Sequence, residues 1–337
     1  MLLRMMQFSE SVASTTGRPG AKRGQFDAAV VANSAICREH LLLRLRVHYF
    51  PPSEPGQFVQ VWCEADGASD ASEAAMAPAY PEVRWKPGTV PPAFHGPDLL
   101  GPQPYLRRPF SIAGRRDDPA SAFSEIDLIY RVIGKATGLM AQLSIGDNIS
   151  ILGPLGNGFS LPQETTTALL VGGGVGIPPM IYLAEKLQRQ GINALAFIGA
   201  QRADLIPLHI TGDVGLESTL NVREFAAFNT PTIVATDDGS MGQKGFVTQA
   251  LQRYCRSTPQ NGAVVFCCGP TPMMRATALV AAEFKLPCYA SLEQPMACGM
   301  GTCQSCVIKY RPAGVEDWVY KLTCKDGPVF NTADILW

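Results

Sequence analysis

The sequence has 337 residues, of which 46% are hydrophobic and 17% are charged, and its formal net charge at pH 7 is -1. A chain of this length exceeds the usual size of one domain, so we expect two or three domains, each with its own core. The balanced charge offers neither the basic surface of a nucleic-acid-binding protein nor an acidic tail for a basic partner.

Three features bear on the compartment. Arg4 breaks the apolar start of the chain, so the continuous hydrophobic region of a signal peptide is lacking. The longest apolar stretch, residues 168–184, contains glycines and prolines and fits a strand, a loop and a helix better than a membrane span. Of ten cysteines, four lie within 27 residues, which favours a metal or cluster site over a disulfide framework. We therefore expect a soluble, cytoplasmic protein that contacts no membrane.

The first domain is predicted to be a small antiparallel barrel. Residues 1–25 are polar and lack apolar periodicity, which predicts a mobile extension. From residue 26 to 161, short β-type runs alternate with turns and no long helix intervenes. The stretch 64–104 shows neither helical nor strand periodicity, and we interpret it as an inserted surface loop. The predicted strands lie at 28–36, 41–50, 56–63, 107–114, 125–133 and 146–153.

Strands and helices alternate over residues 162–287. A strand at 166–173 precedes a helix at 178–191, which Gly191 closes. This alternation predicts a parallel α/β sheet with ligand sites at the carboxyl ends of its strands. Further strands are predicted at 193–200, 230–238, 263–269 and 287–293. Residues 288–337 return to short cysteine-bearing segments and are predicted to form a third module.

The four clustered cysteines carry the most specific signal. Their pattern is C-x4-C-x2-C followed by 17 residues and a fourth Cys, and its first two steps match the plant-type ferredoxin spacing for a 2Fe-2S cluster. Gly299 and Gly301 lie between ligands, where a tight loop has to turn its amides toward sulfur. A structural zinc site is the main alternative, although it commonly pairs two short knuckles. Unliganded thiols are a further alternative. The candidate ligands are Cys298, Cys303, Cys306 and Cys324.

Two glycine-containing turns follow predicted strands. The segment GGGVGIPPM at 172–180 opens a predicted helix, where backbone N–H groups can face phosphate. A tight connection without a ligand explains the same glycines. The segment VVFCCGPTPMM at 264–274 ends another strand, so two strand ends can bracket one dinucleotide.

Two segments of the barrel region offer polar groups. RRPFSI, at 107–112, supplies an arginine for a pyrophosphate and a serine hydroxyl for a ring nitrogen. IYRVIGKATG, at 129–138, supplies a second arginine, a tyrosine and small residues before a threonine. Taken alone, either segment is equally explained as surface polarity.

Taken together, these segments resemble one known family. The resemblance rests on RPFS, IYRVIGKAT, GPLGNGF, VGGGVGIPPM, ATDDGSMGQKGFVT, CGPTPMM and MACGMGTCQSCV with CKDGPVF, in this order over residues 26–337. They are similar to the electron transfer subunits of NAD-dependent dihydroorotate dehydrogenases, in the ferredoxin reductase superfamily. The resemblance implies an antiparallel FAD-binding β-barrel over 26–161, a Rossmann-like parallel α/β NAD-binding domain over 162–287 and a small 2Fe-2S domain over 288–337.

The resemblance also implies roles for individual residues. It implies the two reaction-centre positions, Ser111 near the isoalloxazine and Cys268 near the nicotinamide. Ala136 stands where the family usually has Gly. The cofactor-binding positions that it implies are Arg108, Pro109, Phe110, Ser111, Ile129, Tyr130, Arg131, Ala136 and Thr137 for FAD, and Gly172, Gly173, Gly174, Gly176, Cys268, Gly269 and Pro270 for NAD.

The implied activity is an electron relay in pyrimidine biosynthesis. Electrons would pass from the FMN of a catalytic partner subunit through the 2Fe-2S cluster and FAD to NAD+, in a heterotetramer with two copies of each subunit. Alternatives are a subunit of a hydrogenase, a transhydrogenase or a sulfide-linked reductase, and, from another class, a zinc-stabilised nucleotide-binding module without redox activity. Arg202 could meet the 2'-phosphate of NADP or be solvated, and we favour NAD from the resemblance.

Overall fold

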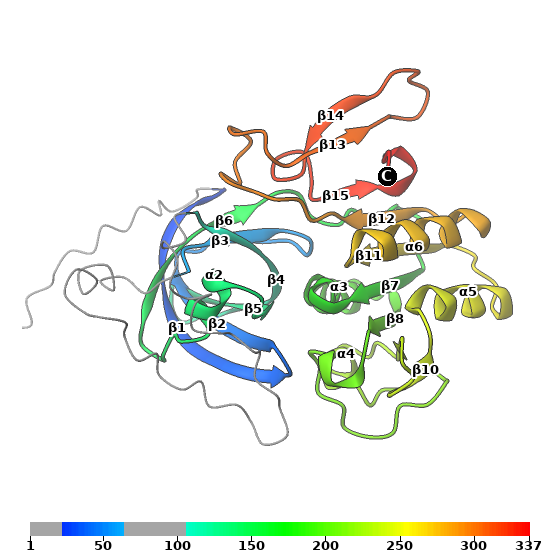
Figure 1. Cartoon of the computed structure of the whole chain (residues 1–337), viewed down its shortest axis with the longest axis horizontal. Helices are drawn as coiled ribbons and strands as arrows, with labels where there is room; N and C mark the ends of the chain where they lie inside the picture. The colour runs from blue at the N-terminus through cyan, green and yellow to red at the C-terminus, as the bar shows by residue number, and fades with distance from the viewer. Residues whose placement is uncertain (1–21, 64–105) are drawn as a thin grey trace, which may run out of the picture.

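The computed structural model describes residues 22–63 and 106–337. The predicted insert at 64–104 and most of the predicted extension at 1–25 lie outside these residues. Figure 1 shows a barrel beside an α/β sheet, with a small hairpin above both. No helix among the described residues has the length and apolar character needed to cross a membrane.

The structure confirms the predicted antiparallel β-barrel. Its six strands close in the order β1-β2-β5-β4-β3-β6, and every neighbouring pair is antiparallel. Alternate residues of a strand face its interior, as the buried Leu41, Leu43 and Leu45 illustrate. The elements are β1 (Gly24–Cys37), β2 (His40–His48), β3 (Phe58–Val61), β4 (Arg108–Asp117), β5 (Phe123–Arg131), α2 (Lys135–Met140) and β6 (Asn148–Leu155).

The α/β sheet confirms the predicted alternation of strands and helices. Seven strands run in the order β10-β9-β8-β7-β11-β12-β15, and all pairs are parallel except β12 with β15. The strands are β7 (Thr167–Gly173), β8 (Asn193–Ala200), β9 (Thr232–Thr236), β10 (Gln243–Lys244), β11 (Ala263–Cys268), β12 (Cys288–Ser291) and β15 (Val329–Asn331). The helical segments are η2 (Gly174–Gly176), α3 (Ile177–Arg189), η3 (Ala203–Leu205), α4 (Arg223–Ala226), α5 (Val247–Ser257), α6 (Thr271–Glu283) and η4 (Thr332–Asp334).

Helices cover both faces of this sheet, which explains why its strands are apolar without alternation. Leu170 packs in the core that contains α3, whereas its neighbours Leu169 and Val171 pack in the core that contains α5 and α6. The predicted helix at 178–191 corresponds to α3, and Gly191 follows it with a φ of +69°. That left-handed conformation is the usual end of a helix at glycine.

The last 50 residues divide between two structures. β13 (Val307–Tyr310) and β14 (Val319–Leu322) form an antiparallel hairpin, whereas β12 and β15 belong to the α/β sheet. The cysteine-bearing segment is therefore built onto the edge of that sheet. Asn157, just after the last barrel strand, binds the cysteine-bearing segment through three hydrogen bonds. Its Nδ2 donates to the carbonyls of Asp326 (3.2 Å) and Val329 (3.0 Å), and its Oδ1 accepts from Val329 N (2.9 Å).

The barrel and the sheet meet along α3. The Tyr182 hydroxyl on this helix donates to the carbonyl of Ser53 (2.8 Å), at a buried contact. At the tip of the β1–β2 hairpin, Arg38 reaches Asp204 at 3.4 Å. These contacts join the barrel to the sheet, and α3 itself packs against β4.

Candidate functional site

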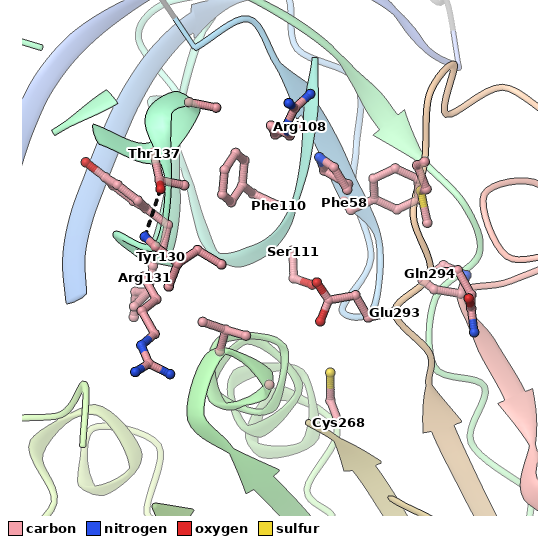
Figure 2. Close-up of a pocket in the computed structure, with 18 of the residues that line it drawn as sticks. Phe58, Arg108, Phe110, Ser111, Tyr130, Arg131, Thr137, Cys268, Glu293 and Gln294 are labelled. Carbon is pink, nitrogen blue, oxygen red and sulfur yellow. Dashed lines mark hydrogen bonds between the residues drawn. The ribbon is translucent and has the colours of Figure 1, made fainter. Parts of the chain in front are cut away.

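A cavity of about 940 Å³ opens between the barrel, the N-terminal end of α3 and the segment after β12. Figure 2 shows it with Phe58, Phe110 and Ser111 on the barrel side and Cys268 opposite. Residues from two distant predicted segments of the barrel and from two strand ends of the sheet converge here. The predicted residues that line it are Arg108, Pro109, Phe110, Ser111, Ile129, Tyr130, Arg131, Ala136, Thr137, Gly176, Cys268 and Gly269.

Arg108 offers a charge to this cavity. Its Nη1 donates to the carbonyl of Leu106 at 2.7 Å, and within the described residues it forms no ion pair with a carboxylate. A guanidinium without an acidic partner is well suited to bind a phosphate group through charge-assisted hydrogen bonds. Strand β4 fixes the position of Arg108 in the barrel. On this strand Pro109 pairs with Gln60 of β3, and Ser111 pairs with Phe58 of β3.

Three residues of the second barrel segment have partners inside the protein. Arg131 pairs with Glu39 at 2.6 Å, so its charge is partly neutralised. The Tyr130 hydroxyl donates to Asn33 Oδ1 (3.0 Å) inside the barrel, and burial raises its pKa. Thr137 Oγ1 accepts from backbone N–H groups at the start of α2, one of which Figure 2 marks. The polar groups of these three side chains are therefore already bound within the protein, and the side chains contribute mainly to the wall of the cavity.

The glycine turn after β7 is explained largely by packing. A Cβ on Gly173 would lie 2.5 Å from the Met273 sulfur, and a Cβ on Gly176 would lie 2.2 Å from the backbone of Cys268. A Cβ on Gly172 would meet the first residue of α3 less closely, 3.2 Å from the Cα of Ile177. Gly174 differs, because it has a φ of +55° and no other atom lies within 4 Å of the position of its Cβ. Gly174 is therefore the glycine of this turn that leaves its backbone open.

Cys268 is a buried thiol at the carboxyl end of β11. Burial raises its pKa to about 12, although a hydrogen bond with Ser291 acts in the opposite direction. At neutral pH it is therefore protonated. Pro270, the other member of this predicted turn, lines a second cavity of about 700 Å³ that adjoins the first.

Sequence reasoning missed several lining residues, namely Phe58, Ser291, Leu292, Glu293, Gln294 and Met296. Figure 2 shows the Glu293 side chain next to Ser111, on the side of the cavity that also holds Cys268. The segment SLEQ lies at the carboxyl end of the strand predicted at 287–293, where parallel sheets bind ligands, and this position was an available signal. Phe58 had no such signal, because it reaches the cavity through its register with Ser111.

The four predicted cluster ligands form two pairs. Backbone N–H groups of Met300 and Cys303 point at the Cys298 sulfur, each at 3.4 Å. The Cys324 N–H points at the Cys306 sulfur, also at 3.4 Å. None of these cysteines forms a disulfide. Gly299 and Gly301 have φ values of +68° and +91°, which let the loop turn its amides inward.

The two pairs differ in their surroundings. Hydrogen bonds with Ser305 lower the pKa of the exposed Cys303 thiol to about 6, whereas burial raises that of Cys324 to about 12. Cys306 and Cys324 pack against Phe58 and Leu155 of the barrel. Within the described residues, no three Cys, His, Asp or Glu side chains surround one point as a single ion would require. Two pairs of cysteines with inward amides fit the two irons of a 2Fe-2S cluster, which would bind them as thiolates.

Two family descriptions match the chain. Residues 293–336 match the iron-sulfur cluster binding domain of dihydroorotate dehydrogenase B, and residues 170–278 match the oxidoreductase NAD-binding domain. The first range contains all four paired cysteines, and the second contains the glycine turn and Cys268.

Among solved structures, the chain is similar to an NADH-dependent reduced ferredoxin-NADP oxidoreductase described for flavin-based electron bifurcation. The TM-score is 0.64 at 26% identity, covering 92% of this chain and 90% of the other. A ferredoxin reductase of carbazole 1,9a-dioxygenase aligns with a TM-score of 0.54 at 20% identity, covering 80% of this chain and 68% of the other. The latter likeness concerns the fold alone.

Several curated relatives share one name, dihydroorotate dehydrogenase B (NAD(+)), electron transfer subunit. The relative from Bacillus velezensis is 39% identical over 234 residues, covering 69% of this chain and 81% of the relative. That from Fusobacterium nucleatum is 37% identical over 245 residues, covering 70% and 82%. Identity of this level over four fifths of a relative, together with the paired cysteines, places this chain in the family of dihydroorotate dehydrogenase B electron transfer subunits.

Proposed function

We propose that the chain passes electrons from a dihydroorotate-oxidising catalytic subunit to NAD+, with a 2Fe-2S cluster, FAD and NAD as its cofactors. The observation that carries this proposal is the continuity of two cavities. The 940 Å³ cavity shares Arg108, Glu293 and Met296 with the adjoining 700 Å³ cavity, which extends to Ser305 on the cysteine loop. The cavities thus extend from Cys268, at the end of β11, to Ala297 and Ser305, which are the chain neighbours of Cys298 and Cys306.

When bound, nicotinamide exchanges a hydride, a 2Fe-2S cluster exchanges single electrons, and FAD can do both. The chain supplies binding and exclusion of water. Arg108 provides the charge for a flavin phosphate, and Phe58 and Phe110 provide apolar walls. The Ser111 hydroxyl is assigned to a flavin ring nitrogen. The protonated Cys268 thiol is assigned to the nicotinamide edge, where it adds no negative charge.

The name shared by the relatives implies a catalytic partner subunit. We assign FMN to that partner and two copies of each subunit to the complex, as the family resemblance implies. A cytoplasmic location accords with the ten cysteines, all of which are free thiols in the structure.

The alternative is an electron relay with a different partner. The solved NADH-dependent reduced ferredoxin-NADP oxidoreductase, to which this chain is similar, is an example of such a protein. The curated relatives, which are more similar to this chain, favour the dihydroorotate partner. Purification of the native complex decides between them. An FMN-containing partner and dihydroorotate-dependent reduction of NAD+ would support the proposal, whereas a hydrogenase-like partner would contradict it.

The cofactor assignment is tested with Cys303→Ser in the purified chain. We expect loss of most iron, acid-labile sulfide and red-brown absorbance, with FAD retained, because Cys303 does not line the flavin cavity. Cys37→Ser is the matched control, since Cys37 lies on β1, outside both cavities. Zinc in place of iron in the wild-type protein would defeat the redox function, and loss of FAD together with iron would contradict separate sites.

A further inference from the structure

Gln60 lies on the face of β3 that is turned away from the barrel interior. Side chains alternate along a strand, and its neighbours Val59 and Val61 pack inside the barrel. Phe58, two residues before Gln60 on the same face, packs with the ligand residues Cys306 and Cys324. Figure 1 shows β3 on the side of the barrel next to the cysteine-bearing segment. Gln60 is therefore directed at that segment.

The amide of Gln60 is buried without a partner. The residue is 0% exposed, and neither Nε2 nor Oε1 has a hydrogen bond. Among the described residues, five buried side-chain nitrogen and oxygen atoms lack a partner, and three of these belong to Gln60 and Thr323. Thr323 immediately precedes the ligand Cys324. Buried polar groups are nearly always paired in proteins, so their concentration at one loop indicates a missing partner there.

Gly299 allows the side-chain amide of Gln60 to pack against the cysteine loop. A Cβ at this position would lie 2.7 Å from Gln60 Nε2 and 2.8 Å from its Cγ, so only a glycine leaves room for the amide. Gly299 directly follows Cys298, and its φ of +68° turns the chain at that point. The amide nitrogen thus lies against the loop that holds the first two ligands, between the barrel and the cluster site.

We propose that Gln60 Nε2 donates a hydrogen bond to a sulfur of the bound 2Fe-2S cluster, so that Gln60 is a positioning residue that raises its reduction potential. The inference rests on the proposed function, because it requires that cluster. A donor on sulfur stabilises the reduced cluster, which carries one more negative charge, more than the oxidised one. Gln60 pairs with Pro109 in the sheet, so the same strand pairing places this donor next to the flavin motif.

The test measures the cluster potential in Gln60→Met by an EPR-monitored redox titration of the FAD-loaded, cluster-loaded chain. Methionine keeps the length of the side chain and removes the donor. We expect the equilibrium constant for one-electron reduction of the cluster to fall about tenfold, which corresponds to about 59 mV for a one-electron couple. The FAD potential is the internal control and is expected to stay constant.

The matched control is Gln57→Leu, on the same segment. Gln57 already has partners, because its Oε1 accepts from Glu54 N and its Nε2 donates to the Gly156 carbonyl, each at 2.8 Å. Its replacement is expected to leave the cluster potential unchanged. A Gln60→Met protein with full iron and sulfide and the wild-type potential would overturn the inference.

If the Gln60→Met protein loses its cluster, its potential cannot be measured, and a second measurement on the wild-type chain tests the hydrogen bond instead. Nitrogen-15 in glutamine side chains is expected to give a hyperfine coupling to the reduced cluster in the wild-type chain. The same coupling is expected in Gln304→Asn, where an unlabelled asparagine replaces the exposed glutamine of the cysteine loop. Absence of that coupling would overturn the inference. A wild-type chain without iron and sulfide would instead defeat the proposed function, so the two failures are distinguishable.

Discussion

Replacing Gly176 by alanine tests how the two strand-end turns are held together. A Cβ at this position would lie 2.2 Å from both the carbonyl carbon and oxygen of Cys268, and 2.4 Å from the nitrogen of Gly269. These are backbone atoms, which cannot rotate out of the way as a side chain does. The turn after β7 and the turn after β11 therefore have to move apart to admit one methyl group.

The expected cost follows from this contact. Added methylenes in a packed interior cost about 1–3 kcal/mol, and a backbone neighbour puts Gly176→Ala at about 3 kcal/mol of lost unfolding free energy. That is a large part of the roughly 5–15 kcal/mol by which folded domains are stable. Because Gly176 and Cys268 both line the 940 Å³ cavity to which we assign FAD, we also expect FAD to be retained less well after desalting.

The assay is denaturant unfolding of the purified chain, with FAD occupancy measured in parallel. Gly174→Ala is the control, because no atom lies within 4 Å of its added Cβ and only its φ of +55° opposes the change. A left-handed alanine costs about 1–2 kcal/mol. If Gly176→Ala unfolds at the same or higher denaturant concentration than Gly174→Ala, the argument from backbone contact is refuted.

Three further outcomes are expected. Arg108→Ala should weaken FAD retention by about 1.5–3 kcal/mol, the usual worth of a charge-assisted hydrogen bond, and unchanged flavin occupancy after desalting would contradict its role. Tyr182→Phe should lower the unfolding free energy by about 1–3 kcal/mol, because it leaves the buried carbonyl of Ser53 unpaired; a wild-type unfolding curve would count against this interface. Burial acts to raise the pKa of Asp127, but hydrogen bonds from Arg44 and a second arginine outweigh it and the pKa is lowered. The stabilisation is therefore present above the ordinary pKa of 3.8 and is lost as pH falls below it, so Asp127→Asn should flatten the acid limb of the stability profile.

Local features of the sequence were sufficient for many elements. Short β-type runs separated by turn residues predicted the positions of all six barrel strands. The unbroken apolar runs predicted β7, β8 and β11, because helices cover both faces of the sheet. The segment 107–112 was placed correctly on a barrel strand, since its residues lie in β4 or just before it.

The partners of the site residues could not be predicted in this way. Arg131 was expected at the FAD site, but its ion pair with Glu39 could not be foreseen, because Glu39 lies far away in the sequence and meets it through the pairing of β2 with β5. Likewise, Glu293 reaches the flavin cavity because β12 lies beside β11, a neighbour relation that no local pattern encodes.

By itself, the sequence determined the features that lie within short segments, above all the spacing of the cysteines. These could be recognised because the candidate ligands of the loop and the glycines that bend it are neighbours in the chain. Only the tertiary structure decided that β15 joins the α/β sheet, that the cysteines form two pairs, and that the amide of Gln60 faces Gly299. These features depend on register and on contacts between residues far apart in the chain, which are fixed when the strands pair and the cores close.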